Sequence, residues 1–178
     1  MDAIAATRHW LERAVIGLNL CPFAKAVHVN GRIRWVESPA RDEQALLEHL
    51  LEELRLLATI DSEQTETTLL IHPHVLNDFL EYNDFLDTVD AAVEALGLAG
   101  VLQVASFHPD YRFEGTDPDD IGNMTNRSPH PMLHLLREDS IARAVAAFPD
   151  AAAIYERNVE TLRRLGANGW HQLISTTP

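Results

Sequence analysis

Histidines follow two apolar stretches of the chain at equivalent positions. The β-rich runs at residues 67–71 and 101–107 each stop at a His-Pro step, His72-Pro73 and His108-Pro109. Ligands of open α/β sheets bind beyond the carboxyl ends of the strands, which is where these residues would lie. The side chains expected near this edge are His72, His74, His108 and Asp110. For His72 and His74 we prefer a structural interpretation, in which proline ends the strand and the histidines are solvated.

A second set of polar residues lies at the end of residues 114–130 and just beyond. This segment is rich in Gly, Pro, Asp and Asn and has no periodic pattern. Pro131 suits the first position of a helix, so His130 would cap that helix and His134 would lie one turn further on. Three neutral imidazoles are a known catalytic set for zinc and are compatible with iron. One hypothesis is therefore a divalent metal site, with a metal-bound water, held by His108, His130 and His134.

The same helix start could instead hold an anion without a metal. Exposed backbone amides and the helix dipole favour a carboxylate or phosphate there, while a histidine acts as acid or base. The expected substrate-binding residues are Asn126, Arg127, Ser128 and Arg137, and the expected catalytic residues are His108 and Asp110. In the structural alternative, these residues form a loop pinned by its own hydrogen bonds, with His130 as a helix cap.

Cys21 is the only cysteine in the chain. It could be a catalytic nucleophile if a histidine or a helix N-terminus lowers its pKa. It could equally be a small buried apolar residue, because its neighbours Leu20, Pro22 and Phe23 are apolar and free cysteines are often buried.

Three strings of the chain resemble those of a bacterial family of about this size, which is known only as a domain of unknown function. The strings are Gly17-Leu18-Asn19-Leu20-Cys21-Pro22-Phe23, Ser106-Phe107-His108-Pro109-Asp110-Tyr111 and Asn126-Arg127-Ser128-Pro129-His130-Pro131. The resemblance covers nearly the whole chain. It supports a site where Cys21 meets the histidine-rich stretch, which runs from Ser106 to Arg137, and it implies no activity or cofactor.

The elements that must position these residues follow from apolar periodicity. An amphipathic helix is expected to end around Gly17 and Asn19, and a leucine stripe predicts a helix over residues 46–57. Residues 27–29 and 32–36 alternate around Asn30-Gly31, which predicts a β-hairpin. Further helices are expected at about residues 84–96, from Pro131 with Leu133, Leu136, Ile141 and Val145 on its apolar face, and from Pro149-Asp150 to Gly166.

The β-rich runs at residues 67–71 and 101–107 are separated by the expected helix at about residues 84–96. Strands and helices that alternate in this way predict right-handed parallel crossovers. The expected fold class is α/β, with α+β as the alternative: a compact layered domain with a mixed sheet of about four strands and about five helices. The chain has 178 residues, which is enough for a single domain over residues 1–178 with a core that needs no structural metal.

Composition limits the partners. The chain has 27 Asp and Glu residues against 14 Lys and Arg, a formal net charge of -13 at pH 7. Nucleic acid and anionic membranes are therefore unexpected partners, because binding them needs a basic face. The single cysteine suits a reducing compartment, and the apolar pattern shows neither a signal sequence nor a membrane span. We therefore expect a soluble cytoplasmic protein.

These observations lead to one function hypothesis and two alternatives. The first is an enzyme that acts on a small anionic metabolite by metal-assisted or histidine acid/base chemistry. The second is a non-catalytic module that binds an anion or a partner through Arg127, Arg137 and the long loop. The third is a thiol-dependent enzyme with Cys21 as nucleophile.

Overall fold

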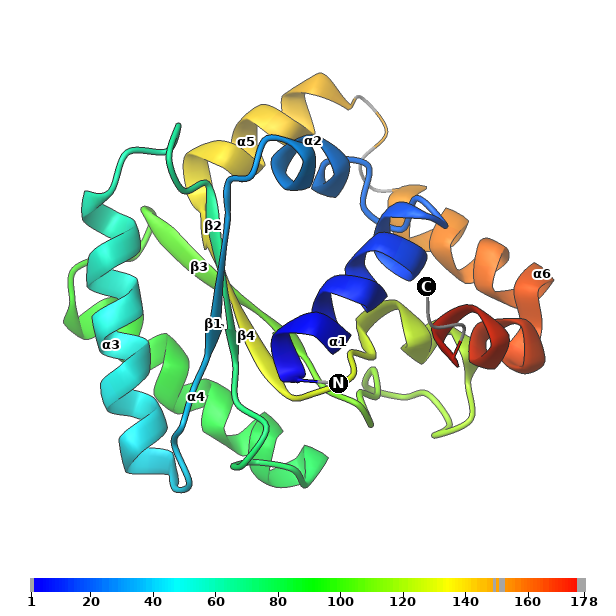
Figure 1. The fold of residues 1–178 in the computed structure, drawn as a ribbon, viewed down its shortest axis with the longest axis horizontal. Coiled ribbons are helices and arrows are strands. Elements are labelled where there is room, and N and C mark those ends of the chain that lie inside the picture. Colours follow the sequence, from blue (N-terminus) through cyan, green and yellow to red (C-terminus); the bar gives the residue numbers. More distant parts are fainter. Residues whose placement is uncertain (1, 149, 151–152, 176–178) are drawn as a thin grey trace.

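The computed structural model describes residues 2–148, 150 and 153–175. Within these residues, four strands form one sheet with helices on both faces (Figure 1). The strands are β1 (Ile33–Glu37), β2 (Thr67–Ile71), β3 (Leu102–Phe107) and β4 (Met132–Arg137). The helices are α1 (Ala3–Trp10), α2 (Ala24–Val29), α3 (Glu43–Thr59), α4 (Phe79–Ala95), α5 (Glu138–Ala147) and α6 (Ala153–Ser175), together with the π-helix η1 (Leu11–Ile16) and the 3-10 helix η2 (Ile121–Asn126).

The sheet is mixed and has the strand order β1-β2-β4-β3. β1 pairs in parallel with β2, whereas β4 runs antiparallel to both β2 and β3. β1, β2 and β3 therefore run in the same direction, and α3 and α4 are the crossover helices between them. The carboxyl ends of these three strands lie at one edge of the sheet. The predicted mixed α/β sheet is confirmed.

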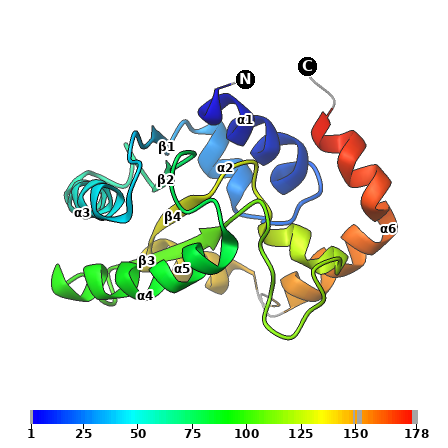
Figure 2. The same ribbon diagram turned by 90° about the horizontal axis from the view of Figure 1, so that it is seen from below.

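Each face of the sheet carries its own apolar core. α3 and α4 pack on one face and α1 and η1 on the other, as Figure 2 shows, while α6 packs against η1 and η2. The leucine stripe of α3 faces the sheet as expected, and its members Leu46, Leu50, Leu54 and Leu57 are at most 1% exposed. Among the described helices, none is long and apolar enough to cross a membrane.

The predicted β-hairpin at Asn30-Gly31 is wrong, because residues 24–29 form α2. Gly31 has a φ of 68° and ends this helix. Its N–H donates to His28 O at 3.0 Å, and the N–H of Arg32 donates to Val27 O at 3.1 Å. Hairpin turns and helix C-termini both need a residue with positive φ, so the Asn-Gly dipeptide fits either structure.

The predicted helix from Pro131 is also wrong, because residues 132–137 form the strand β4. It lies in the interior of the sheet, where Leu133 pairs with both Leu70 and Ser106. Leu133 and Leu135 join the core under α3 and α4, and Met132 joins the opposite core. A strand that is buried on both faces has an unbroken apolar run, which does not alternate as a half-exposed strand would. The helix begins later, at Glu138.

Other boundaries differ from the expectations by smaller amounts. α4 begins at Phe79 rather than near residue 84, because Asp78 caps its first turn. The long segment at residues 114–130 contains η2 and so is not wholly irregular. Pro149 lies outside the described residues, and the last helix begins at Ala153. It changes direction at Gly166, which has a φ of 69°, and then continues to Ser175 instead of ending.

Candidate functional site

The histidines that follow β2 and β3 lie at the predicted sheet edge, but the protein encloses them. His72 and His108 are both 0% exposed, so the expectation that His72 is a solvated edge residue is wrong. His74, two residues further along, is exposed as expected. Asp110 is exposed too, and its backbone N–H donates to His108 Nδ1 at 3.0 Å.

Tyr82 of α4 packs against both buried imidazoles. Its ring centroid lies 5.8 Å from that of His72 and 5.1 Å from that of His108. The Tyr82 hydroxyl donates to Met132 O at 2.9 Å and accepts from the Phe107 N–H at 3.0 Å. It therefore joins α4 to the end of β3 and the beginning of β4, and burial raises the pKa of this hydroxyl.

The two imidazoles hold the connection between β2 and α4. The Nδ1–H of His72 donates to Val75 O at 3.0 Å, and the Nε2–H of His108 donates to Leu76 O at 3.1 Å. Leu76 has a φ of 57°, in the left-handed region that residues with a Cβ seldom occupy. These two hydrogen bonds flank and support that backbone conformation.

Both buried imidazoles are neutral at pH 7. The pKa of His72 is lowered to about 4, mainly by burial, while the hydrogen bond to Val75 O raises this pKa and the neighbouring His108 lowers it. Burial also lowers the pKa of His108, with Asp110 and Asp78 acting in the opposite direction. Because both His108 nitrogens are engaged and its ring is covered, this side chain presents no nitrogen to a substrate.

His134 lies within the sheet, away from this edge. The Thr67 hydroxyl donates to Leu135 O and accepts from the Nε2–H of His134 at 2.8 Å. Burial lowers the pKa of His134 to about 4. Its ring packs beside Phe107 with the centroids 6.1 Å apart, so His134 acts as a polar residue of the core.

The structure does not bring His108, His130 and His134 together as the metal hypothesis required. That hypothesis placed His130 and His134 on one helix face, but His130 precedes β4 and His134 lies within this strand. Within residues 2–148, 150 and 153–175, no group of three or more His, Cys, Asp or Glu side chains could hold a metal ion.

The Asn126-Arg127-Ser128 string is engaged in hydrogen bonds to the backbone. Arg127 donates from Nε to Tyr111 O at 3.0 Å and from Nη2 to Pro118 O at 2.7 Å. Asn126 Nδ2 donates to Ser106 O at 3.1 Å, and the Ser128 hydroxyl donates to the carbonyl of His130 at 2.7 Å. This arrangement matches the structural alternative, in which the long loop is pinned by its own hydrogen bonds.

Replacing Arg127 with alanine is therefore expected to loosen the loop between Tyr111 and Pro118. Losing two hydrogen bonds from a charged donor should make tryptic cleavage after the exposed Arg112 about tenfold faster. Limited proteolysis followed by mass spectrometry measures this rate. Arg163→Ala, at an exposed position of α6, is the matched control, and equal cleavage rates in the two variants would refute this role for Arg127.

Arg137 does not join Arg127 in one basic spot, because the two residues lie at opposite ends of β4. Arg137 Nη2 donates to Ile60 O at 2.8 Å and to Thr65 O at 3.0 Å. It thereby fixes the connection between α3 and β2 at the amino end of β2. Arg127 and Arg137, which were both expected to bind an anion, therefore hold separate parts of the fold.

Cys21 lies on the connection between η1 and α2. Cys21 is half-buried and packs against the apolar core beneath α1 and α6. These apolar surroundings fit the alternative in which Cys21 is a small apolar residue, and a joint site with the histidine-rich stretch stays a prediction.

A Ser-His-Glu network joins β1 to α3. Ser38 Oγ lies 2.9 Å from His49 Nδ1, and His49 Nε2 lies 3.9 Å from Glu53 Oε1. Glu53 accepts two hydrogen bonds from Arg34, at 2.7 and 2.9 Å. Ser38 is 0% exposed, so its hydroxyl is out of reach of a substrate and the network serves to hold the two elements together.

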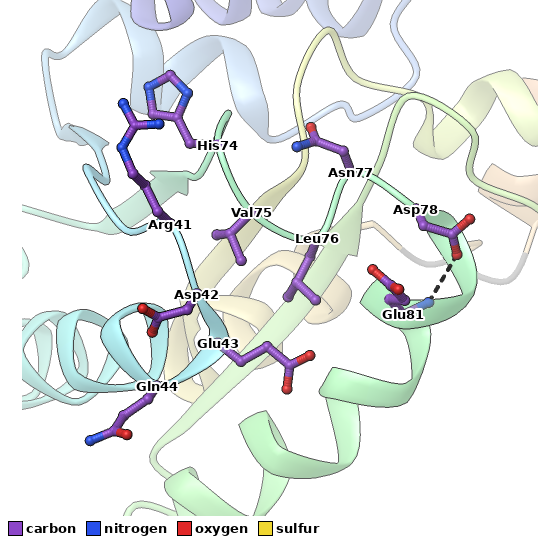
Figure 3. Close-up of a pocket in the computed structure, with 10 residues that line it drawn as sticks. All are labelled: Arg41, Asp42, Glu43, Gln44, His74, Val75, Leu76, Asn77, Asp78 and Glu81. Atoms are coloured by element: carbon purple, nitrogen blue, oxygen red, sulfur yellow. Dashed lines mark hydrogen bonds between the residues drawn. The ribbon is translucent and has the colours of Figure 1, made fainter.

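A groove of about 710 Å³ lies at the carboxyl edge of β1 and β2, where each strand leads into a helix (Figure 3). We call it the β1/β2 groove. Its volume is within the range of small-molecule sites. Its lining residues are Arg41, Asp42, Glu43, Gln44, His74, Val75, Leu76, Asn77, Asp78 and Glu81.

Two strand-to-helix connections position the groove's side chains. Asp42 caps α3 by accepting from the Ala45 N–H at 2.8 Å, and Asp78 caps α4 by accepting from the Leu80 N–H at 2.8 Å. Arg41 comes immediately before the first cap, and His74 lies on the second connection. Both side chains extend to the same side of the groove (Figure 3).

His130 lies close to this side of the groove. Burial is the main cause that lowers its pKa, while Glu37 at the end of β1 raises the pKa and His74 lowers it. The three side chains are thus near enough for their charges to interact. His130, His74 and Glu37 come from three separate segments that meet at the carboxyl edge of β1 and β2.

The prediction from sequence included His74 and His130 but missed Arg41. A signal was present, because Ser38-Pro39-Ala40-Arg41-Asp42 follows β1 as His72-Pro73 follows β2. A proline near the end of a strand and an Asp cap before a helix mark the same kind of connection in both places.

Comparison with known proteins gives one family match. A family model described as "Protein of unknown function (DUF1415)" matches residues 2–172. No curated protein and no solved structure matches the chain.

Proposed function

Since this chain belongs to the family of proteins of unknown function DUF1415, we propose a function from the chemistry of the β1/β2 groove itself. The protein is an enzyme that binds a small anionic metabolite in this groove and acts on it by histidine acid/base chemistry. One observation carries the proposal: Arg41 and His74 are exposed on the same side of the groove, and Arg41 forms no ion pair within the described part of the chain.

Arg41 is the residue that would bind the anion. A guanidinium presents a planar set of donors that matches a carboxylate or a phosphate in two parallel hydrogen bonds. The chain is acidic overall, with a formal charge of -13, so an unpaired arginine in a groove makes a local site for an anion on a surface that otherwise repels one.

His74 is the residue that would move a proton, with His130 as its neighbour. Histidine is the side chain most often used for proton transfer near neutral pH. Burial is the main cause that lowers the pKa of His130, Glu37 raises that pKa, and the neighbouring His74 lowers it. His130 therefore favours its neutral form beside His74.

Arg41→Gln is expected to weaken binding of inorganic phosphate about tenfold, which corresponds to about 1.4 kcal/mol. Titration followed by NMR, with the shifts of the His74 ring and its neighbours as the signal, measures this affinity. Arg55→Gln, at an exposed position of α3 outside the groove, is the matched control. If phosphate does not shift the His74 signals, or if the two variants bind it equally, the anion site is refuted.

His74→Asn tests the catalytic part of the proposal in the same preparation. Loss of an acid or base costs a rate factor of about 100 or more, so turnover within a panel of small carboxylates and phosphate esters should fall by at least that factor, while phosphate still binds. Turnover that is unchanged in His74→Asn would exclude this residue as the acid or base.

A non-catalytic binding module is the second candidate. The observation that favours it is that every charged side chain lining the groove is exposed, whereas enzymes commonly exclude water from the reacting atoms. If the protein is such a module, Arg41→Gln should lose the same phosphate affinity. The unmodified protein should then turn over no member of the panel.

We also propose that the protein works in the cytoplasm without a nucleic-acid partner. A single cysteine allows no intramolecular disulfide, which suits a reducing compartment. The excess of acidic residues opposes binding to phosphate backbones.

A further inference from the structure

The β1/β2 groove carries both signs of charge. Arg41 and His74 lie together at one side, next to the helix-capping Asp42, and Glu43, Asp78 and Glu81 lie toward the other (Figure 3). All six side chains are exposed. A ligand that spans the groove would therefore meet Arg41 and His74 at one end and the carboxylates of Glu43 and Glu81 at the other.

The two sides do not neutralise each other. Within the described residues, neither Arg41 nor any acidic residue of the groove takes part in an ion pair, so the opposite charges lie more than 4.0 Å apart. The Asp78 carboxylate accepts from the backbone N–H groups of Leu80 and Glu81. The side chains of Glu43 and Glu81 form no hydrogen bond in the described part of the chain and remain able to accept one from a ligand.

Apolar side chains lie between the charged sides. Val75 and Leu76 line the groove there, and both are at most 8% exposed (Figure 3). The hydrogen bonds from His72 and His108 fix the backbone of these two residues. The middle of the groove is thus a fixed apolar strip, which suits a hydrocarbon segment rather than a third charged group.

We propose that the ligand of this groove is a zwitterion with separated charges, a carboxylate or phosphate at one end and an amine at the other, joined by a short hydrocarbon chain. This inference rests on the anion site of the proposed function and adds the substrate class. Arg41 binds the anionic end, with His74 beside it. Glu43 and Glu81 bind the ammonium group, and Val75 and Leu76 contact the chain between them.

Three probes of matched size test the inference: 6-aminohexanoate, which carries both charges, hexanoate, which has only the carboxylate, and hexylamine, which has only the amine. NMR titrations that follow the backbone signals of residues 41–44 and 74–81 give the three affinities. We expect 6-aminohexanoate to bind about fivefold tighter than hexanoate, the gain that one exposed ion pair can supply, and hexylamine to bind most weakly.

The acidic side is tested with Glu43→Gln/Glu81→Gln. This double variant should reduce the affinity for 6-aminohexanoate to that for hexanoate, and it should not weaken hexanoate. Glu52→Gln/Glu94→Gln makes the same change of net charge at exposed positions of the same two helices outside the groove. Circular dichroism of both variants checks that they are folded.

The possible failures are distinguishable. If hexanoate binds at the groove as tightly as 6-aminohexanoate, the zwitterion inference is wrong and the anion site stands. If the two double variants lose the same affinity for 6-aminohexanoate, the gain comes from net charge alone and the inference is again wrong. If no probe shifts residues 41–44 or 74–81, both the inference and the proposed anion site are wrong.

Discussion

Acidification from pH 7 to pH 4 is expected to lower the free energy of unfolding by about 3 kcal/mol through His72 alone. The folded pKa of His72 is about 4, below its ordinary value of 6.5, because burial disfavours the charged ring. Above pH 6.5 the ring is neutral in both the folded and the unfolded chain. Between pH 6.5 and about 4 the unfolded chain binds a proton that the folded chain excludes, so stability falls as the pH falls.

His134 should add a smaller loss over the same range. Burial lowers its pKa to about 4 as well, but its side chain keeps some contact with solvent, which screens part of the effect. Losses of this size are a large share of the free energy of unfolding of a typical domain, which is about 5–15 kcal/mol. Acid unfolding well above pH 3 is therefore expected.

Urea denaturation at a series of pH values measures this linkage. His72→Asn keeps a side-chain donor for Val75 O and removes the imidazole, so the difference in stability between pH 7 and pH 4 should shrink by about 3 kcal/mol, whatever its absolute stability. His171→Asn, at an exposed position of α6, is the matched control. If the stability of His72→Asn depends on pH as strongly as that of the unmodified chain, His72 is not the cause of the pH dependence.

Tyr82→Phe is expected to destabilise the protein by about 3 kcal/mol. The change removes only the hydroxyl, which leaves the Phe107 N–H and the Met132 carbonyl without their partner in the core. Each unsatisfied buried group costs about 1–3 kcal/mol. The ring remains, so its contacts with His72 and His108 are largely preserved and the loss reports on the hydrogen bonds.

The midpoint of urea denaturation at pH 7 measures this loss. Tyr155→Phe removes a hydroxyl from a residue that is 47% exposed, and it should change the free energy of unfolding by less than about 0.5 kcal/mol. A Tyr82→Phe protein as stable as Tyr155→Phe would mean that water replaces the missing hydroxyl and that α4 does not depend on it.

Where one interpretation of the pattern was available, the sequence predicted the fold well. The leucine stripe of α3 and the β-rich runs of β2 and β3 each fit one periodicity, and each lies where expected. The errors fall at residues that fit two structures. Asn30-Gly31 suits a hairpin turn as well as a helix end, and the apolar run after Pro131 suits a helix face as well as a fully buried strand.

Those errors explain what was missed in the candidate site. The hairpin prediction would have paired β1 with residues 27–29, so the parallel pairing of β1 with β2 was not foreseen, and neither was the position of Arg41 beside His74. The sheet edge itself was predicted correctly from His72 and His108. Their burial was not, because it depends on Tyr82 and on the Val75-Leu76 backbone, which reach them only in the folded chain.

The position of β4 also fixes when the sheet can be completed during synthesis. β1 and β2 pair with each other through a single crossover, so they can join as soon as residue 71 has emerged from the ribosome. Among the strands that the structure describes, β3 is paired with β4 alone. β3 ends at residue 107, and β4 begins 25 residues later, at residue 132. The strand made last is thus the one that joins the two halves, and a nascent chain that stops short of residue 132 leaves β3 without a partner.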